Sequence, residues 1–155
     1  MKSKVPISES DVSHYDFGSD TYYLSQETAL DFWKKNIHKT ARHRFEIPFG
    51  TWLDTESETI HKNWASYYNS DDSKPIEDAL TKVQWDRNDI VYFIWQNNGI
   101  IETSWKEFVK HWMVYMAYFD DCPIIYNISN ESRFKAIEFT PRGLILAITG
   151  ELKTI

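Results

Sequence analysis

Paired carboxylates are the residues of this sequence with the greatest capacity for chemistry. They fall into four clusters, each in an expected loop or at an expected helix edge: Asp71 and Asp72, Glu77 and Asp78, Asp86 and Asp89, and Asp120 and Asp121. Two converging carboxylates can act as the acid and the base of a hydrolase. Carboxylates can equally pair with Lys or Arg of a protein partner, or simply cap helices and face solvent.

Other catalytic and cofactor signatures are absent from the sequence. Its five glycines are isolated, so no glycine-rich turn can hold a phosphate, and no Gly-x-Ser-x-Gly segment occurs. The single cysteine, Cys122, follows two aspartates that disfavour its thiolate. His38 and His43 lie in a cationic stretch that repels metal ions, and the other histidines are isolated. We therefore predict no catalytic residue, no metal site and no cofactor.

The negative charge of the chain is concentrated in its later part. Residues 1–53 hold 7 Lys or Arg against 7 Asp or Glu, whereas residues 54–155 hold 10 against 16, and the formal net charge is -6. Such a field repels phosphate backbones, so direct nucleic-acid binding is not expected. It attracts a basic protein, although a net charge of this size also serves solubility alone.

Aromatic residues are abundant, with 7 Trp, 9 Tyr and 9 Phe in 155 residues. Most of them are expected in the core. Tyr67 and Tyr68 lie beside the first acidic cluster, and aromatic side chains that point outward next to carboxylates can anchor a protein interface. We predict that both tyrosines contact a partner together with the four acidic clusters.

The sequence also bears on the compartment. One cysteine cannot form an intrachain disulfide, which is typical of a reducing cytosol. The first twenty residues lack the basic start and apolar block of a secretory signal. The longest apolar run, 112–119, is far shorter than the roughly 18 residues of a membrane helix. We predict a cytoplasmic protein without membrane contact.

The elements that would position these residues begin with helices. Residues 1–20 show no clear period, and we expect them to dock loosely. Ser25 is the expected N-cap of a first helix. Thr55 and Glu58 have capping-box spacing and predict a second helix that continues through Tyr68. Pro75 marks the first turn of a third.

The second half predicts a sheet and one long helix. An apolar run over 90–95 is followed by Asn98-Gly99, which favours a hairpin with a type I′ turn. Ser104 and Glu107 then begin a helix with an apolar stripe, and Pro123 follows its end. Three short apolar segments, 124–128, 134–140 and 144–149, are expected as antiparallel strands.

These expectations define an α+β fold with a single domain over residues 21–155. N-terminal helices precede a β-hairpin, a helix and a three-stranded antiparallel meander, with a sheet of about five strands. The chain is long enough for one hydrophobic core.

One segment resembles a known family. The motif Trp85-Asp86-x-x-Asp89, an apolar strand, Thr103-x-Trp105-x-x-Phe108-x-x-x-Trp112 and Asp120-Asp121 are similar to a family of small uncharacterised proteins from gammaproteobacteria, over residues 85–128. That family implies no site residues. In size, acidity and lack of catalytic motifs, the chain also resembles immunity proteins of contact-dependent inhibition and related toxin systems, which bind a cognate toxin and block it.

This second resemblance implies a cytoplasmic, non-enzymatic immunity protein that covers the active site or substrate groove of a basic nuclease toxin. Two alternatives stay open. The chain could be a small enzyme or metabolite-binding domain that uses its carboxylates, or a structural subunit that self-associates through its aromatics. The sequence does not indicate the oligomeric state.

Overall fold

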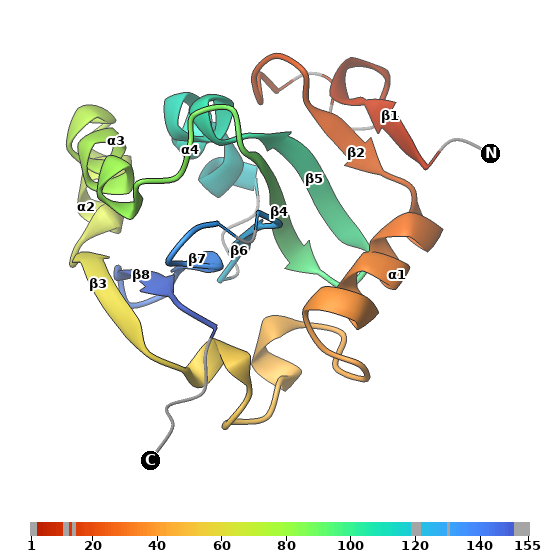
Figure 1. The fold of residues 1–155 in the computed structure, drawn as a ribbon. Helices are drawn as coiled ribbons and strands as arrows, with labels where there is room; N and C mark the ends of the chain where they lie inside the picture. Colours follow the sequence, from red (N-terminus) through yellow and green to blue (C-terminus); the bar gives the residue numbers. More distant parts are fainter. Residues whose placement is uncertain (1–2, 11–12, 14, 119–121, 130, 151–155) are drawn as a thin grey trace.

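An eight-stranded antiparallel sheet is the central feature of the computed structural model, which describes residues 3–10, 13, 15–118, 122–129 and 131–150. Its strand order is β1-β2-β5-β4-β6-β7-β8-β3, so β1 and β3 form the two edges (Figure 1). The strands are β1 Lys4–Pro6, β2 Tyr22–Leu24, β3 Ser57–His61, β4 Ile90–Gln96, β5 Gly99–Ser104, β6 Ile124–Asn127, β7 Ala136–Phe139 and β8 Ile145–Ile148.

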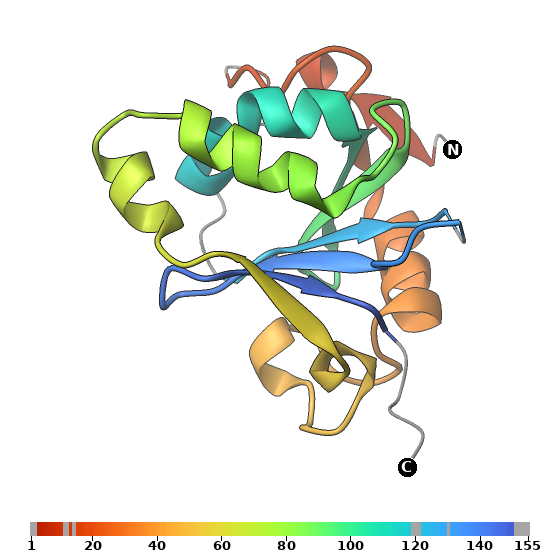
Figure 2. The ribbon, with the colours of Figure 1, turned by 60° about the vertical axis from the view of Figure 1, so that its left-hand side comes forward.

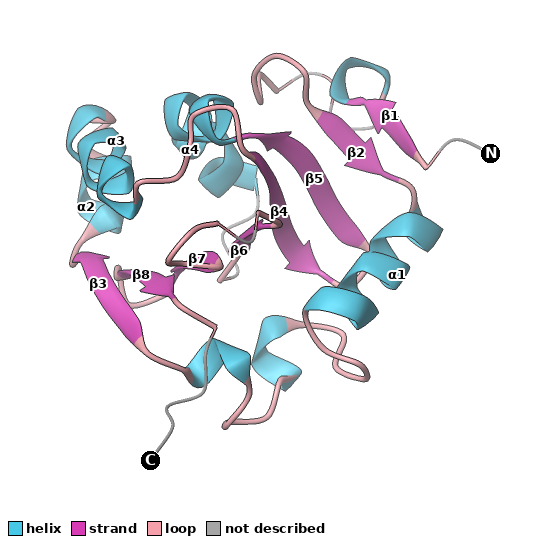
Figure 3. Ribbon diagram, viewed as in Figure 1, coloured by secondary structure: helices cyan, strands magenta, loops and turns pink. Residues whose placement is uncertain are grey.

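Helices cover both sides of this sheet. The helices are α1 Gln26–Asn36, α2 Trp64–Asn69, α3 Lys74–Leu80 and α4 Trp105–Tyr118. Figure 2 shows α3 and α4 on one side of β6, β7 and β8, with α1 and the turns of residues 44–54 on the other. The same division is visible when the ribbon is coloured by secondary structure (Figure 3).

Two hydrophobic clusters fill the spaces on either side of the sheet. Because successive side chains of a strand point to opposite faces, Ile137 and Phe139 of β7 pack towards α3 and α4, while Ala136 packs towards α1. Trp112, Phe93 and several other large side chains are fully buried in the first cluster. The central strands are therefore largely apolar on both faces.

One buried charge lies on the α1 side of the sheet. Glu138 of β7 is only 4% exposed, and its Oε1 accepts a hydrogen bond from Arg44 Nε at 2.6 Å. The thiol of Cys122 donates to the same oxygen at 3.0 Å. Asp54 lies beside the guanidinium, with Oδ1 4.0 Å from Arg44 Nη2. The Arg44 side chain thus neutralises a carboxylate that the core would otherwise exclude.

Several predicted elements are confirmed. Ser25 caps α1, because its side chain accepts from the backbone N–H of Thr28 at 3.3 Å. Pro75 lies in the first turn of α3. The helix that follows Ser104 is α4, and the strands β4 and β5 form the expected hairpin. The three C-terminal strands lie within the predicted segments.

The predicted architecture is nevertheless wrong. The fold is α+β, but its sheet has eight strands instead of the predicted five or so. Strand β6 pairs with β4, and β8 pairs with β3, so that all eight strands form one sheet. These long-range pairings join segments whose local patterns contain no information about their partners.

The predicted helix from Thr55 is also wrong over its first half. Residues 57–61 form β3, which pairs with β8, and the helix begins only at Trp64. The type I′ turn is not present either, since positive φ occurs at neither Asn98 nor Gly99. A bulge between Ile94 and Gln96 changes the register next to the turn. The Trp95 indole lies against Gly99, where a Cβ atom would overlap it.

The N-terminal segment is more integrated than the predicted loose docking. Residues 4–6 form the edge strand β1, which pairs with β2. Phe17 is fully buried and contacts the ring of Tyr115 at a centroid distance of 4.9 Å. Most residues of this segment are polar, and the few apolar side chains among them that reach the core form no recognisable pattern in the sequence.

Candidate docking cleft between α2 and α4

The short helix α2 is held in place by the turn between β7 and β8. Trp64, its first residue, is buried, and its indole N–H donates to Thr140 O at 3.1 Å. The backbone N–H of Trp64 donates to Gly143 O at 2.9 Å. Asn63 caps the helix by accepting from Ser66 N at 3.1 Å. A rigid anchor of this kind fixes the direction of the side chains that follow.

Tyr67 and Tyr68 are both half-buried. Tyr67 packs edge-on against His61, with ring centroids 5.3 Å apart. Burial, followed by the charge of Lys82, lowers the pKa of that histidine. Tyr68 lies between Trp64 and Trp112, at centroid distances of 6.3 and 6.4 Å. One side of the Tyr68 ring is therefore supported by the core.

Asp71 and Asp72 follow after Asn69 and Ser70, and both are exposed. Their backbone N–H groups donate to Tyr68 O at 3.2 Å and to Tyr67 O at 2.9 Å, which ends α2. Asp71 has a positive φ of 57°, a conformation that aspartate tolerates better than most residues. Neither carboxylate forms an ion pair with a described residue, so both are free to attract a cationic partner.

Tyr68 and Asp71 border an open cleft of about 440 Å³ between α2 and the C-terminal half of α4. We call it the Tyr68 cleft. Its lining combines aromatic and aliphatic side chains with one carboxylate: Tyr15, Tyr68, Asn69, Asp71, Met113, Val114 and Ala117. An apolar depression with a negative rim is suited to receive an aliphatic or aromatic side chain from a basic surface.

The sequence profile of one family, described as "Protein of unknown function (DUF2947)", matches residues 2–146. The chain belongs to this family. No curated protein and no solved structure matches it.

The remaining predicted acids lie elsewhere on this family member. Asp78 pairs with Lys74 at 3.2 Å. Asp86 Oδ1 accepts from Asn88 N at 2.8 Å. Asp89 Oδ2 accepts from Asp86 N at 3.2 Å and from Asn127 Nδ2 at 3.0 Å. Asp86 and Asp89 therefore serve the turn before β4.

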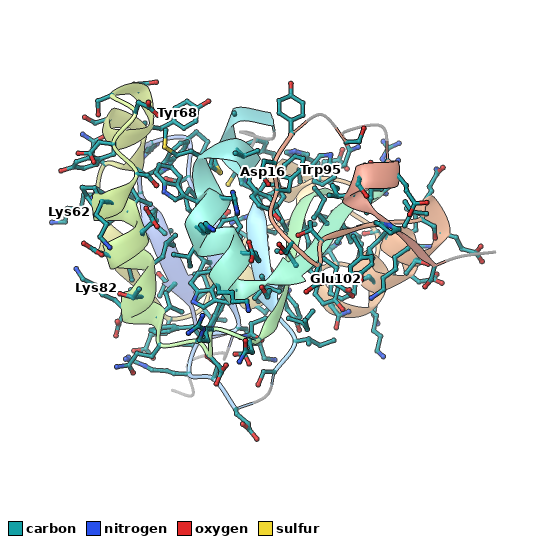
Figure 4. All side chains as sticks on the ribbon, turned by 90° about the horizontal axis from the view of Figure 1, so that it is seen from above. Asp16, Lys62, Tyr68, Lys82, Trp95 and Glu102 are labelled. Atoms are coloured by element: carbon teal, nitrogen blue, oxygen red, sulfur yellow. The ribbon has the colours of Figure 1, made fainter. Side chains whose placement is uncertain are left out.

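Glu77 is likewise occupied, since its Oε2 accepts from Ser73 Oγ at 2.8 Å. Figure 4 shows Tyr68 and Lys82 towards opposite ends of α3. Asp71 and Asp72 follow Tyr68 in the chain, whereas Asp86 and Asp89 follow Lys82. Asp120 and Asp121 lie outside the described residues. Of the predicted docking residues that the structure describes, Tyr68 and Asp71 line the Tyr68 cleft, and Tyr67 and Asp72 are their neighbours in the chain.

A polar cluster that the sequence analysis missed lies beside the Tyr68 cleft. His111 Nε2 is 3.3 Å from Glu107 Oε2, and its Nδ1 is 4.0 Å from Asp16 Oδ2. Asp16 lies next to α4 in Figure 4. The backbone of α4 leaves helical geometry at His111, with φ -114° and ψ 18°. The signal in the sequence was the spacing of Glu107 and His111, which places them on one helix face.

Buried hydroxyl groups lie below this cluster. Tyr115 donates from its hydroxyl to Phe17 O at 3.0 Å, and burial raises its pKa. Thr21 and Thr103 share a hydrogen bond of 3.0 Å between their hydroxyls. These contacts attach the N-terminal segment to α4 and β5, and so position Tyr15 and Asp16 at the cleft.

Within the described residues, no group of three or more His, Cys, Asp or Glu side chains is arranged to hold a metal ion. The helices described there are also too short or too polar to cross a bilayer.

Gly18 is expected to be required for the attachment of the N-terminal segment. Its φ is +103°, and a Cβ atom there would lie 2.6 Å from Glu107 Oε2 and 3.0 Å from His111 Cδ2. We expect Gly18→Ala to lower the free energy of unfolding by about 1 to 3 kcal/mol, as measured by urea denaturation. Gly50→Ala is the matched control, because Gly50 also has positive φ but no atom lies within 4 Å of its Cβ position. Equal losses in both variants would contradict the proposed crowding.

Proposed function

We propose that this protein is a cytoplasmic, non-enzymatic binding domain that neutralises a basic toxin, as immunity proteins do, by docking it at the Tyr68 cleft. The observation that carries the proposal is the meeting of apolar and acidic groups at one place: Tyr15, Tyr68 and Met113 line the same cleft as Asp71. The resemblance to immunity proteins in size, acidity and lack of catalytic motifs supplies the class of partner.

The two kinds of group would contribute different parts of the binding. Exposed ion pairs are individually worth only about 0 to 1 kcal/mol, so Asp71 and Asp72 would act mainly by speeding association with a cationic surface. Tight binding would come from desolvation of the cleft, in which a half-buried Tyr68 ring already rests on Trp112. Little side-chain freedom is then lost when a partner covers it.

The proposed interface is smaller than an acidic face that would extend over the whole molecule. Asp78 is already paired, and Asp86 and Asp89 are engaged in the turn before β4. The charge that remains for a partner near the cleft is that of Asp71 and Asp72. We therefore expect a compact interface centred on α2, with α4 and the backbone around Tyr15 at its rim.

The proposal predicts that the open reading frame next to this gene encodes a toxin C-terminal domain, and the direct test is binding of this protein to that domain. Isothermal titration with the purified domain should show a one-to-one complex, and coexpression should restore growth of cells that produce the domain. The complex should be lost in Val114→Arg, which fills the cleft with a charged side chain while Val114 is only partly buried in the free protein. Absence of a complex with the native chain, or an unaffected complex in Val114→Arg, would overturn the proposal.

Reversal of the cleft charge should slow association. For Asp71→Lys combined with Asp72→Lys, we expect the association rate at low salt to fall about tenfold, with a smaller change in dissociation, because rim charges act mainly on the encounter. Stopped-flow measurements over a range of salt concentrations would show a weaker salt dependence in the variant. The control is Glu27→Lys combined with Asp31→Lys, the same charge change at two exposed positions of α1. A rate that falls equally in both variants would indicate net charge alone.

A further inference from the structure

A second cleft lies at the other end of the α3 and α4 pair. The Tyr68 cleft uses the C-terminal turns of α4, whereas this one uses its N-terminal turns and the end of α3. Its volume is about 290 Å³, and Trp85, Trp105 and Val109 provide its apolar lining. This volume is close to the lower limit of small-molecule sites, which range from about 300 to 1,000 Å³. The cleft therefore suits a small ligand.

Three cations surround this cleft, which we call the cationic cleft. They are Arg87, Lys106 and Lys110, all exposed and all part of its lining. None of them forms an ion pair with a described residue. Glu77 is the single carboxylate among the lining residues. A local excess of positive charge in a chain of net charge -6 is the opposite of what the composition suggests.

Trp105 supplies an independent indication of a ligand. The residue is only 3% exposed, and its ring packs on Trp85 at a centroid distance of 4.8 Å. Trp85 uses its indole N–H internally, as a donor to Phe134 O at 3.0 Å. The Trp105 N–H has no hydrogen-bond partner among the described residues. Among those residues, Thr51 Oγ1 is the one fully enclosed side-chain polar atom without a hydrogen bond, so the Trp105 N–H is not fully enclosed. The small open part of Trp105 thus includes its N–H group.

These groups offer complementary contacts to one kind of molecule. A buried aromatic side chain with an unpaired donor normally finds an acceptor. Positive charges in the lining of the same cleft favour an anionic acceptor, because charge-assisted hydrogen bonds are stronger than neutral ones. The indole rings and Val109 provide a surface for a flat apolar body. We propose that the cationic cleft binds a small organic carboxylate with a flat apolar body, received by Arg87, Lys106, Lys110 and the Trp105 N–H.

Substitution of Glu77 is expected to change the affinity for an anionic ligand in the opposite direction from substitution of the three cations. Its Oε2 accepts from Ser73 Oγ, and Ser73 in turn accepts from the Trp112 indole N–H at 3.0 Å. This chain of hydrogen bonds fixes the carboxylate at the wall of the cleft. A negative charge held there opposes an anionic ligand, so removal of that charge strengthens binding.

The test uses cinnamate as the probe and its uncharged amide, cinnamamide, as the matched ligand. Correlation spectra of the labelled protein resolve the indole N–H signals, and Trp105→Phe assigns the signal of Trp105. We expect cinnamate to shift that signal and to bind at least about tenfold more tightly than cinnamamide. Inorganic phosphate, which lacks the apolar body, is expected to bind more weakly than cinnamate.

Variants then separate specific binding from general attraction. Lys106→Gln combined with Lys110→Gln should weaken cinnamate binding about tenfold, whereas Glu77→Gln should strengthen it about threefold. Lys34→Gln combined with Lys35→Gln makes the same charge change on α1, outside the cleft, and should leave it unchanged.

Three results would overturn the proposal: no shift of the Trp105 signal at millimolar cinnamate, equal binding of cinnamate and cinnamamide, or equal weakening in the two lysine pairs. The toxin complex forms at the other end of α4 and is measured without cinnamate. Failure of one proposal is therefore distinguishable from failure of the other.

Discussion

Replacement of Trp112 with alanine is expected to lower the free energy of unfolding by about 4 kcal/mol, because removal of a buried tryptophan side chain typically costs 3 to 5 kcal/mol. Trp112 is fully buried between α4 and the sheet, where its ring lies 6.2 Å from that of Phe139. Its indole N–H donates to Ser73 O and Oγ at 3.3 and 3.0 Å, which ties α4 to the start of α3. Urea denaturation followed by circular dichroism measures the loss.

Trp112→Phe separates the packing from the hydrogen bonds. The phenyl ring retains most of the apolar contact but leaves Ser73 without its donor, so a loss of about 1 to 2 kcal/mol is expected. Tyr68 should become more mobile in Trp112→Ala, since one supporting ring is gone, and the docking proposal then predicts weaker toxin binding. A loss below about 1 kcal/mol in Trp112→Ala would contradict this description of the core.

Replacement of Arg44 with methionine is expected to cost about 3 kcal/mol. The change leaves Glu138, whose side chain is 5% exposed, without its cationic partner. Removal of one member of a buried ion pair typically costs 3 to 5 kcal/mol. The lower end applies here because the Arg44 side chain is 19% exposed and water can reach the vacated position. Chemical denaturation at neutral pH measures the effect.

A second substitution tests whether the unpaired charge is the cause. Glu138→Met in the Arg44→Met background removes that charge, and apolar replacement of a whole buried pair is often neutral or stabilising. We expect the double variant to recover most of the lost stability. If it is no more stable than Arg44→Met, the loss must come from displacement of the turn at residues 44–46 instead.

Local sequence signals predicted the elements whose structure is determined by residues close together in the chain. Helix α1 has an N-cap serine and an apolar face, and α4 has fourteen residues with a strong apolar stripe. The hairpin β4–β5 joins neighbouring segments through a two-residue connection. In these cases the residues that determine the structure are close together in the chain, and pattern reasoning is sufficient.

The sheet was underestimated because its remaining strands depend on distant partners. Strands β1 and β2 have three residues each, and β2 is joined to β5 about 80 residues later in the chain. The capping-box spacing of Thr55 and Glu58 favours a helix here, but pairing of residues 57–61 with β8 outweighs this weak local preference. Only the tertiary structure reveals that these short segments extend one sheet to eight strands.

The site also combines residues that are neighbours in the sequence with residues that only the tertiary structure brings together. Tyr67, Tyr68, Asp71 and Asp72 are neighbours in sequence, and the structure keeps them together. Met113 and Tyr15 line the same cleft from other elements, and no local pattern could place them there. The cationic cleft was missed because Arg87, Lys106 and Lys110 are scattered within the more acidic part of the chain, where their effect on net charge is hidden.

The two outer strands have a consequence for association between copies of this chain. Open strand borders can recruit further strands and so start fibres. Here one border carries Lys4 and Pro6. The other begins with three exposed polar residues, of which Glu58 holds Arg133 at 2.6 Å. Lys4 and the missing backbone donor of Pro6 at one margin, and exposed polar and charged side chains at the other, therefore disfavour the addition of a further strand.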